Sequence, residues 1–114
     1  MIAAQAMGAD GAIGSAYNVL PRLFVQAYEA FNVGDTTKAR DLQAKGNRAI
    51  NVFLGFPSLS ALKEMTRLIG FDCGSARPPS LSLSDQQKGQ LREMLDDIGF
   101  FDFAETRISQ QNAV

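Results

Sequence analysis

Residues 8–18 read Gly-Ala-Asp-Gly-Ala-Ile-Gly-Ser-Ala-Tyr-Asn, a stretch that predicts a short buried strand, a tight turn and the start of a helix. Ala12 and Ile13 are the apolar centre of this strand, which we place at residues 11–13. Gly14 and Ser15 are small residues that allow a close backbone turn, and Asn18 is a suitable cap for the next helix. Enzymes with α/β sheets carry their ligands at the carboxyl ends of strands, so this turn is a candidate site.

The same stretch resembles the last barrel strand of N-acetylneuraminate lyases, which belong to the Schiff-base aldolase family that includes dihydrodipicolinate synthase. Later segments are similar to this family as well. They are Gly34-Asp35 with Ala39, Leu42 and Gln43, the loop 70–74 with Arg77-Pro78-Pro79, and the segment from Ser84 to Phe101. The resemblance covers nearly the whole chain and corresponds to the C-terminal part of the family only.

The resemblance implies an α/β fold, the C-terminal part of a TIM (β/α)8 barrel, in which this segment is mostly α-helical with one short strand and about four helices. A complete barrel takes about 250 residues. This chain has 114 residues and begins at Met1 in what looks like the end of a helix, so we expect a fragment of a barrel. Residues 1–33 are expected to form the last strand and its flanking helices, and residues 34–114 a C-terminal helical cap.

Apolar residues at helical spacing predict four main helices, near residues 18–33, 35–54, 58–69 and 84–98. Glycines end three of them, at Gly34, Gly70 and Gly99. Asp35 is a cap for the second helix, and Ser84 with Gln87 forms a capping-box signal for the fourth. Gly46 weakens its helix by about 1 kcal/mol relative to alanine, which indicates close packing at that point. The polar tail after Phe103 is expected to fray.

The composition excludes several classes of function. The charge is nearly balanced, with 11 basic and 12 acidic residues and no basic run, so we expect no nucleic-acid partner. No apolar run approaches the ~20 residues of a membrane span, and we expect no secretory signal. The single cysteine, Cys73, excludes an internal disulfide and favours a reducing cytoplasm. Because the chain has no histidine, it offers no zinc-type ligand cluster and no histidine-dependent triad, and we expect neither metal nor cofactor.

Gly14 and Ser15 are the candidate substrate-binding residues. A serine beside a glycine at a strand end is a turn residue more often than a ligand contact. In N-acetylneuraminate lyases, however, the serine at this position hydrogen-bonds the polyol part of the sugar acid, and Ser15 matches it. Dihydrodipicolinate synthases lack the Gly-Ser pair, so the pair favours the sialic-acid branch. Ala16 departs from the pattern, because these lyases usually have threonine there.

Imine chemistry requires a lysine whose pKa is lowered in a desolvated pocket. The lysines of this chain all lie in helical segments, at Lys38, Lys45, Lys63 and Lys88. The resemblance implies that the catalytic lysine, the proton-relaying tyrosine and the Gly-rich carboxylate motif belong to earlier barrel segments. We therefore assign no catalytic residue here and expect the isolated chain to be inactive. In the late loop, we expect Cys73 to be inert and Arg77 to pair with a carboxylate or a carbonyl.

The function implied by the resemblance is that of the C-terminal portion of an N-acetylneuraminate lyase-like class I aldolase. Such an enzyme cleaves a sialic acid to pyruvate and N-acetylmannosamine through a lysine Schiff base. The alternatives are dihydrodipicolinate synthase or another 2-keto-acid aldolase of the family, and a non-catalytic helical remnant or interaction module. The expected partners are a small sugar acid or pyruvate in the complete barrel, and a second copy or a complementary barrel fragment. In the isolated chain we expect Leu23, Phe24 and Phe31 to be exposed.

Overall fold

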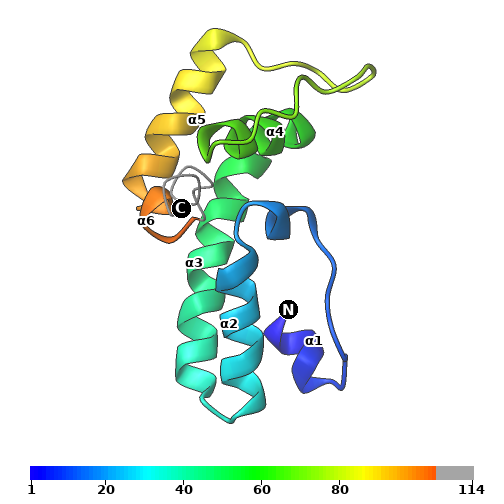
Figure 1. Cartoon of the computed structure of the whole chain (residues 1–114), viewed down its shortest axis with the longest axis vertical. Helices are drawn as coiled ribbons and strands as arrows, with labels where there is room; N and C mark the ends of the chain where they lie inside the picture. The colour runs from blue at the N-terminus through cyan, green and yellow to red at the C-terminus, as the bar shows by residue number, and fades with distance from the viewer. Residues whose placement is uncertain (105–114) are drawn as a thin grey trace, which may run out of the picture.

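The computed structural model describes residues 1–104 as helices joined by loops (Figure 1). The elements are α1 (Ile2–Ala6), the 3₁₀ helix η1 (Ser15–Asn18), α2 (Pro21–Asn32), α3 (Thr36–Leu54), α4 (Ser58–Leu68), α5 (Asp85–Asp97) and α6 (Phe100–Phe103). The tail that was expected to fray lies largely in residues 105–114, outside the described residues. None of the described helices is long and apolar enough to cross a membrane.

The four main helices predicted from the sequence are confirmed as α2, α3, α4 and α5. Local signals set their ends. The Asp35 carboxylate accepts from the Lys38 backbone N–H at 3.0 Å, and Ser84 and Gln87 form both bonds of a capping box. Gly34 lies in the left-handed region with φ of 83°, a conformation that glycine adopts without a steric cost.

The first main helix begins later than predicted, because residues 15–18 form η1 and α2 starts at Pro21. Leu20, the residue before the proline, has φ of −135° and ψ of 43°, since the proline ring disfavours a helical conformation there. The prediction that Asn18 caps this helix was wrong. Its side-chain amide instead donates to the Ser15 carbonyl oxygen at 3.0 Å within η1.

The predicted strand at residues 11–13 is not formed, and residues 1–104 contain no strand. Residues 9–14 run as an open segment from α1 to η1, on the side of α2 that is away from α3 (Figure 1). Ile13, predicted to be buried in a sheet, is 100 % exposed. A strand requires a neighbouring strand to receive its backbone hydrogen bonds, and the described part of the chain provides none. The local sequence is therefore compatible with a strand, but residues 1–104 contain no second strand to pair with it.

The core begins where α2 and α3 pack side by side (Figure 1). Gly46 of α3 lies against Phe24 of α2, so closely that a Cβ at position 46 would stand 2.5 Å from Phe24 Cζ. The close packing predicted at Gly46 is thus confirmed. The expectation that Leu23 and Phe24 are exposed was wrong, because α3 covers both side chains, and Phe31 is half-buried.

α4 and α5 form a second helical layer across one end of α3 (Figure 1). Their shared interior consists of fully buried side chains, which include Met65, Leu91, Leu95 and Phe100. The short helix α6, which the sequence did not predict, folds back after Gly99 and places Phe100 in this interior. The long loop between α4 and α5 is tied to α4 by the Ser60 hydroxyl, which donates to the Leu81 carbonyl at 2.6 Å.

Candidate functional site

Gly14 and Ser15 stand at the junction between the open segment and η1. Gly14 is extended, with φ of −177° and ψ of 149°, and its carbonyl accepts from the Tyr17 N–H at 3.1 Å to open the 3₁₀ turn. Ala16 is buried in the core and fixes the turn in place. Ser15 is exposed, and among residues 1–104 its hydroxyl has no recorded hydrogen-bond partner. The predicted site residues are therefore adjacent and available to a ligand.

The open segment has one side that faces α2. Ala12 lines a hollow of about 450 Å³ together with Tyr17, Phe24 and Tyr28. A Cβ at Gly14 would meet the Tyr17 ring at 3.4 Å, so position 14 faces the same side as position 12. Side chains alternate between the two faces of an extended chain. Ile13 and Ser15 therefore belong to the opposite face, directed away from α2.

The C-terminal helices lie directly beside this junction. Asn18 of η1 lines a hollow of about 250 Å³ with Lys63 and Thr66 of α4 and with Cys73 of the long loop. Cys73 is exposed, and its Sγ lies 3.3 Å from Thr66 Oγ1. The fold thus places the long loop next to the turn that carries Ser15, although about 60 residues separate them in the sequence.

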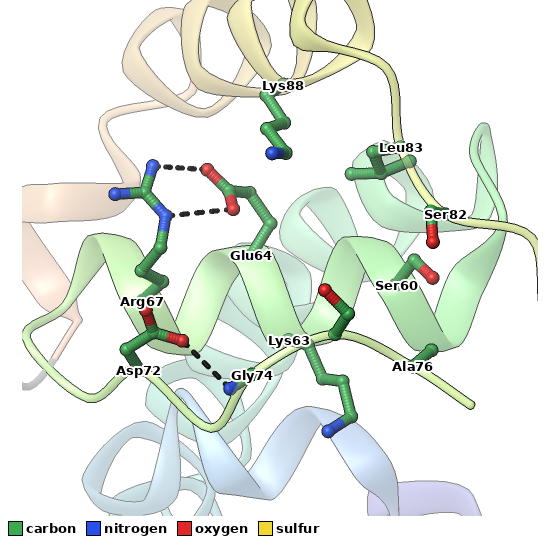
Figure 2. Close-up of a pocket in the computed structure, with 11 residues that line it drawn as sticks. Ser60, Lys63, Glu64, Arg67, Asp72, Gly74, Ala76, Ser82, Leu83 and Lys88 are labelled. Carbon is green, nitrogen blue, oxygen red and sulfur yellow. Dashed lines mark hydrogen bonds and ion pairs between the residues drawn. The ribbon is translucent and has the colours of Figure 1, made fainter.

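A second polar cluster, which the sequence analysis missed, lies on the other side of α4 (Figure 2). The Arg67 guanidinium donates two hydrogen bonds to Glu64, from Nε to Oε2 at 2.9 Å and from Nη2 to Oε1. Glu64 is only 7 % exposed and Arg67 is 49 % exposed at its side chain. The pKa of Arg67 is raised, first by this hydrogen bond and then by the charge of Glu64.

This ion pair lines a hollow of about 280 Å³ with Lys88, Asp72 and the loop residues 74–76, but neither Gly14 nor Ser15 lines that hollow. Both carboxylate oxygens of Glu64 are occupied by Arg67, so the pair has the arrangement of a structural clamp rather than of a general acid or base. The sequence signal was the i,i+3 spacing of opposite charges on one helix.

The structure leaves the lysines on helices, as predicted. Lys63 Nζ donates to the Cys73 carbonyl at 3.2 Å and points away from the Glu64–Arg67 pair (Figure 2). Lys88 pairs with Asp85 at 3.6 Å, whereas Lys38 and Lys45 are exposed on α3. No lysine lies on the open segment.

Arg77 does not pair as expected. It is exposed, and within residues 1–104 no carboxylate or carbonyl accepts from its side chain. Its backbone carbonyl accepts from the Ser80 N–H at 3.1 Å, which shapes the turn instead. The described residues also contain no group of three or more acidic, histidine or cysteine side chains placed to hold a metal ion.

Comparison with known proteins gives matches over most of the chain. Residues 1–98 match the model of the dihydrodipicolinate synthetase family. N-acetylneuraminate lyase of Sus scrofa is 37 % identical over 108 residues, which cover 90 % of this chain and 34 % of that protein. The 4-hydroxy-tetrahydrodipicolinate synthase of Archaeoglobus fulgidus is 28 % identical over 92 residues, or 81 % of this chain and 32 % of that protein.

The fold is similar to that of a solved relative. The structure of N-acetylneuraminate lyase from Aliivibrio salmonicida superposes with a TM-score of 0.79 at 31 % identity, over 87 % of this chain and 33 % of that one. The chain thus spans about a third of the length of the relatives that it matches.

Proposed function

Because this chain belongs to the dihydrodipicolinate synthetase family, we propose that it forms the C-terminal portion of an N-acetylneuraminate lyase-like class I aldolase. The complete enzyme is a (β/α)8 barrel that cleaves a sialic acid to pyruvate and N-acetylmannosamine through a lysine Schiff base. Residues 1–33 supply the last barrel strand with its flanking helices, and residues 34–114 supply the C-terminal helical cap. The lysine that forms the imine lies in the other part of the barrel.

The observation that carries this proposal is the alternation along the open segment. In a barrel, one side of each strand faces the outer helices and the other side faces the interior. Ala12 and Gly14 face α2, which is the helix that follows the segment. Ile13 and Ser15 are therefore on the side that faces the barrel interior, and Ser15 stands at the carboxyl end, where barrel enzymes bind their substrates.

The roles within the site follow from this placement. The Ser15 hydroxyl can both donate and accept a hydrogen bond, which suits the polyol chain of a sugar acid. Gly14 has no side chain, so the backbone before Ser15 can pass close beside the Tyr17 ring. Neither residue has acid–base chemistry to offer near neutral pH. Their contribution is to hold and orient the substrate, while the imine is formed elsewhere.

Two other functions remain as alternatives. A dihydrodipicolinate synthase-like or other 2-keto-acid aldolase would use the same barrel and the same imine. The Gly14-Ser15 pair favours the sialic-acid branch over it. A non-catalytic helical remnant would share the helical core but would need no ligand contact at Ser15. The exposure of Ile13 on the open segment and of Ser15 at the start of η1 favours a piece of an enzyme over a remnant.

Borohydride trapping with pyruvate tests the proposal. The chain is assayed alone and after co-expression with the first two thirds of a homologous lyase, which supplies the other strands. We expect a covalent adduct only in the mixture, on the complementing fragment and not on this chain. An adduct on one of this chain's own lysines would refute the assignment of the imine to the other part of the barrel. Failure of the two pieces to associate would favour the remnant.

A further inference from the structure

Tyr28 joins α2 to the open segment that precedes η1. Its hydroxyl donates to the Asp10 carbonyl oxygen at 2.9 Å. Its ring lines the same hollow as Ala12. Its own carbonyl accepts from Gln5 Nε2 at 3.1 Å, and the same amide donates to Asn32 Oδ1 at 2.8 Å. One residue of α2 therefore contacts both α1 and the start of the open segment.

The other end of the segment is fixed independently. Ala16 is buried in the core, and the Tyr17 ring packs edge-on against Phe24 with 4.6 Å between the ring centroids. Between these two anchors, residues 11–13 have no recorded backbone hydrogen bond. The span from Asp10 to Ser15 is about 16 Å of extended chain. At the Asp10 end, the Ala9 N–H donates to the Ala4 carbonyl of α1 at 3.0 Å, and the Tyr28 hydroxyl adds the bond that joins this end to α2.

The hydrogen bond to Asp10 is directional as well as close. Successive carbonyls of an extended chain point to opposite edges, so a hydroxyl that reaches the Asp10 carbonyl cannot take the carbonyl of a neighbour unless the segment rotates. A rotation of the segment about its long axis would redirect the side chains of residues 11–13. Because Ala16 holds the far end, this rotation would be absorbed in the backbone that leads into the Ser15 turn.

We propose that Tyr28 is a positioning residue, which fixes the orientation of the open segment and thereby the direction in which its backbone enters the Ser15 turn. The role in substrate binding rests on the proposed function, but the orientation itself is a property of this chain. Tyr28 touches no substrate, because its side chain lies on the α2 side of the segment. Its effect reaches Ser15 through Asp10 and the intervening backbone.

Spin labelling of the full chain tests this proposal without any enzyme assay. A nitroxide is attached to a cysteine at position 13 (Ile13→Cys) or, as a reference, at an exposed position of α3 (Lys45→Cys), each with Cys73→Ser. Labelled chains are diluted into unlabelled chains, so that association does not broaden the spectra. Tyr28→Phe keeps the ring and removes the hydroxyl. Tyr17→Phe is the matched control, because Tyr17 lines the same hollow and its hydroxyl has no hydrogen-bond partner within residues 1–104.

We expect Tyr28→Phe to shorten the rotational correlation time of the label at position 13 about twofold or more, an effect of releasing one anchor of the segment. The label at position 45 should be unchanged, and Tyr17→Phe should change neither. If the label at position 13 keeps its wild-type spectrum in Tyr28→Phe, the proposal is overturned. If both label positions become mobile, Tyr28 is a general stability residue, which also overturns it. Neither result bears on the borohydride experiment, so the two proposals fail separately.

Discussion

Gly46 of α3 lies directly against the Phe24 ring of α2, where a Cβ on residue 46 would lie 2.5 Å from Phe24 Cζ and 2.9 Å from Cε1. Real Cβ atoms do not approach so closely, and Phe24 is buried, so its ring has little room to move. The contact joins the helix that follows the candidate site to the helix that begins the C-terminal cap. The position of the site therefore depends on this helix pair.

Gly46→Ala is expected to destabilise the chain by about 1–2 kcal/mol, because overpacking at Phe24 outweighs the helix-propensity gain of about 1 kcal/mol. The matched control is Gly89→Ala in α5, where an added Cβ meets no atom within 4 Å. That change should stabilise the chain by about 0.5–1 kcal/mol. Urea unfolding midpoints measure both effects. A stabilising Gly46→Ala would show that the helices separate easily at this point.

Arg67→Met is expected to destabilise the chain by about 1–3 kcal/mol, because it leaves the nearly buried Glu64 carboxylate without its partner. The half exposure of Arg67 keeps the effect below that of a fully buried pair. The control is the double variant Glu64→Met with Arg67→Met, which should recover part of the loss, since no unpaired charge remains. A double variant that recovers none of the stability lost in Arg67→Met would contradict this account of the pair.

The contribution of Arg67 to the free energy of unfolding should not depend on pH in the neutral range. Its pKa is raised above the ordinary value of an arginine, first by the hydrogen bond to Glu64 and then by the charge of Glu64. A cation with a raised pKa stabilises the fold fully below its unfolded-state pKa and loses that effect only as the pH rises past the folded-state value. The difference in unfolding free energy between wild type and Arg67→Met should therefore be constant from about pH 7 to about pH 10. A steady decline of this difference in unfolding free energy over the same pH range would mean that another titrating group controls the pair.

Ser15→Ala is expected to weaken sugar-acid cleavage in the reconstituted barrel while imine formation with pyruvate stays largely intact. The reason is that Ser15 is assigned to the polyol and not to the keto acid. The loss of one hydrogen bond to a neutral ligand group corresponds to about a threefold to tenfold loss in kcat/KM. Ser75→Ala is the control, because Ser75 lines the hollow beside Glu64 and not the open segment. An equal loss in both steps would refute the assignment.

Sequence reasoning succeeded where the signal was local. Asp35, Ser84 and Gly34 act within one turn of their own positions, and each was predicted and found. Gly46 was also readable, because a glycine inside a helix costs stability and needs a packing reason. The prediction of a strand at residues 11–13 failed for the opposite reason, since a strand depends on a distant neighbour and residues 1–104 contain no other strand.

The site shows the same division between local and non-local information. The Gly14-Ser15 turn could be placed from its residues, but the side that Ser15 faces required Ala12, Tyr17 and Tyr28 in three dimensions. Arg77 was expected to pair with a carboxylate or a carbonyl, and its side chain has neither partner within residues 1–104. The Glu64–Arg67 pair was missed, although its i,i+3 spacing on one helix is a local signal.

The most direct test of the central claim, that this chain is one part of a barrel and not a self-sufficient domain, is sedimentation of the purified chain at micromolar concentration. Residues 11–13 have unpaired backbone groups along the open segment, and Ile13 and Val25 add exposed apolar surface. We predict self-association of the isolated chain, and its conversion to a single defined complex when a fragment with the other strands is added. A monomeric chain that unfolds cooperatively on heating and does not bind that fragment would contradict the account.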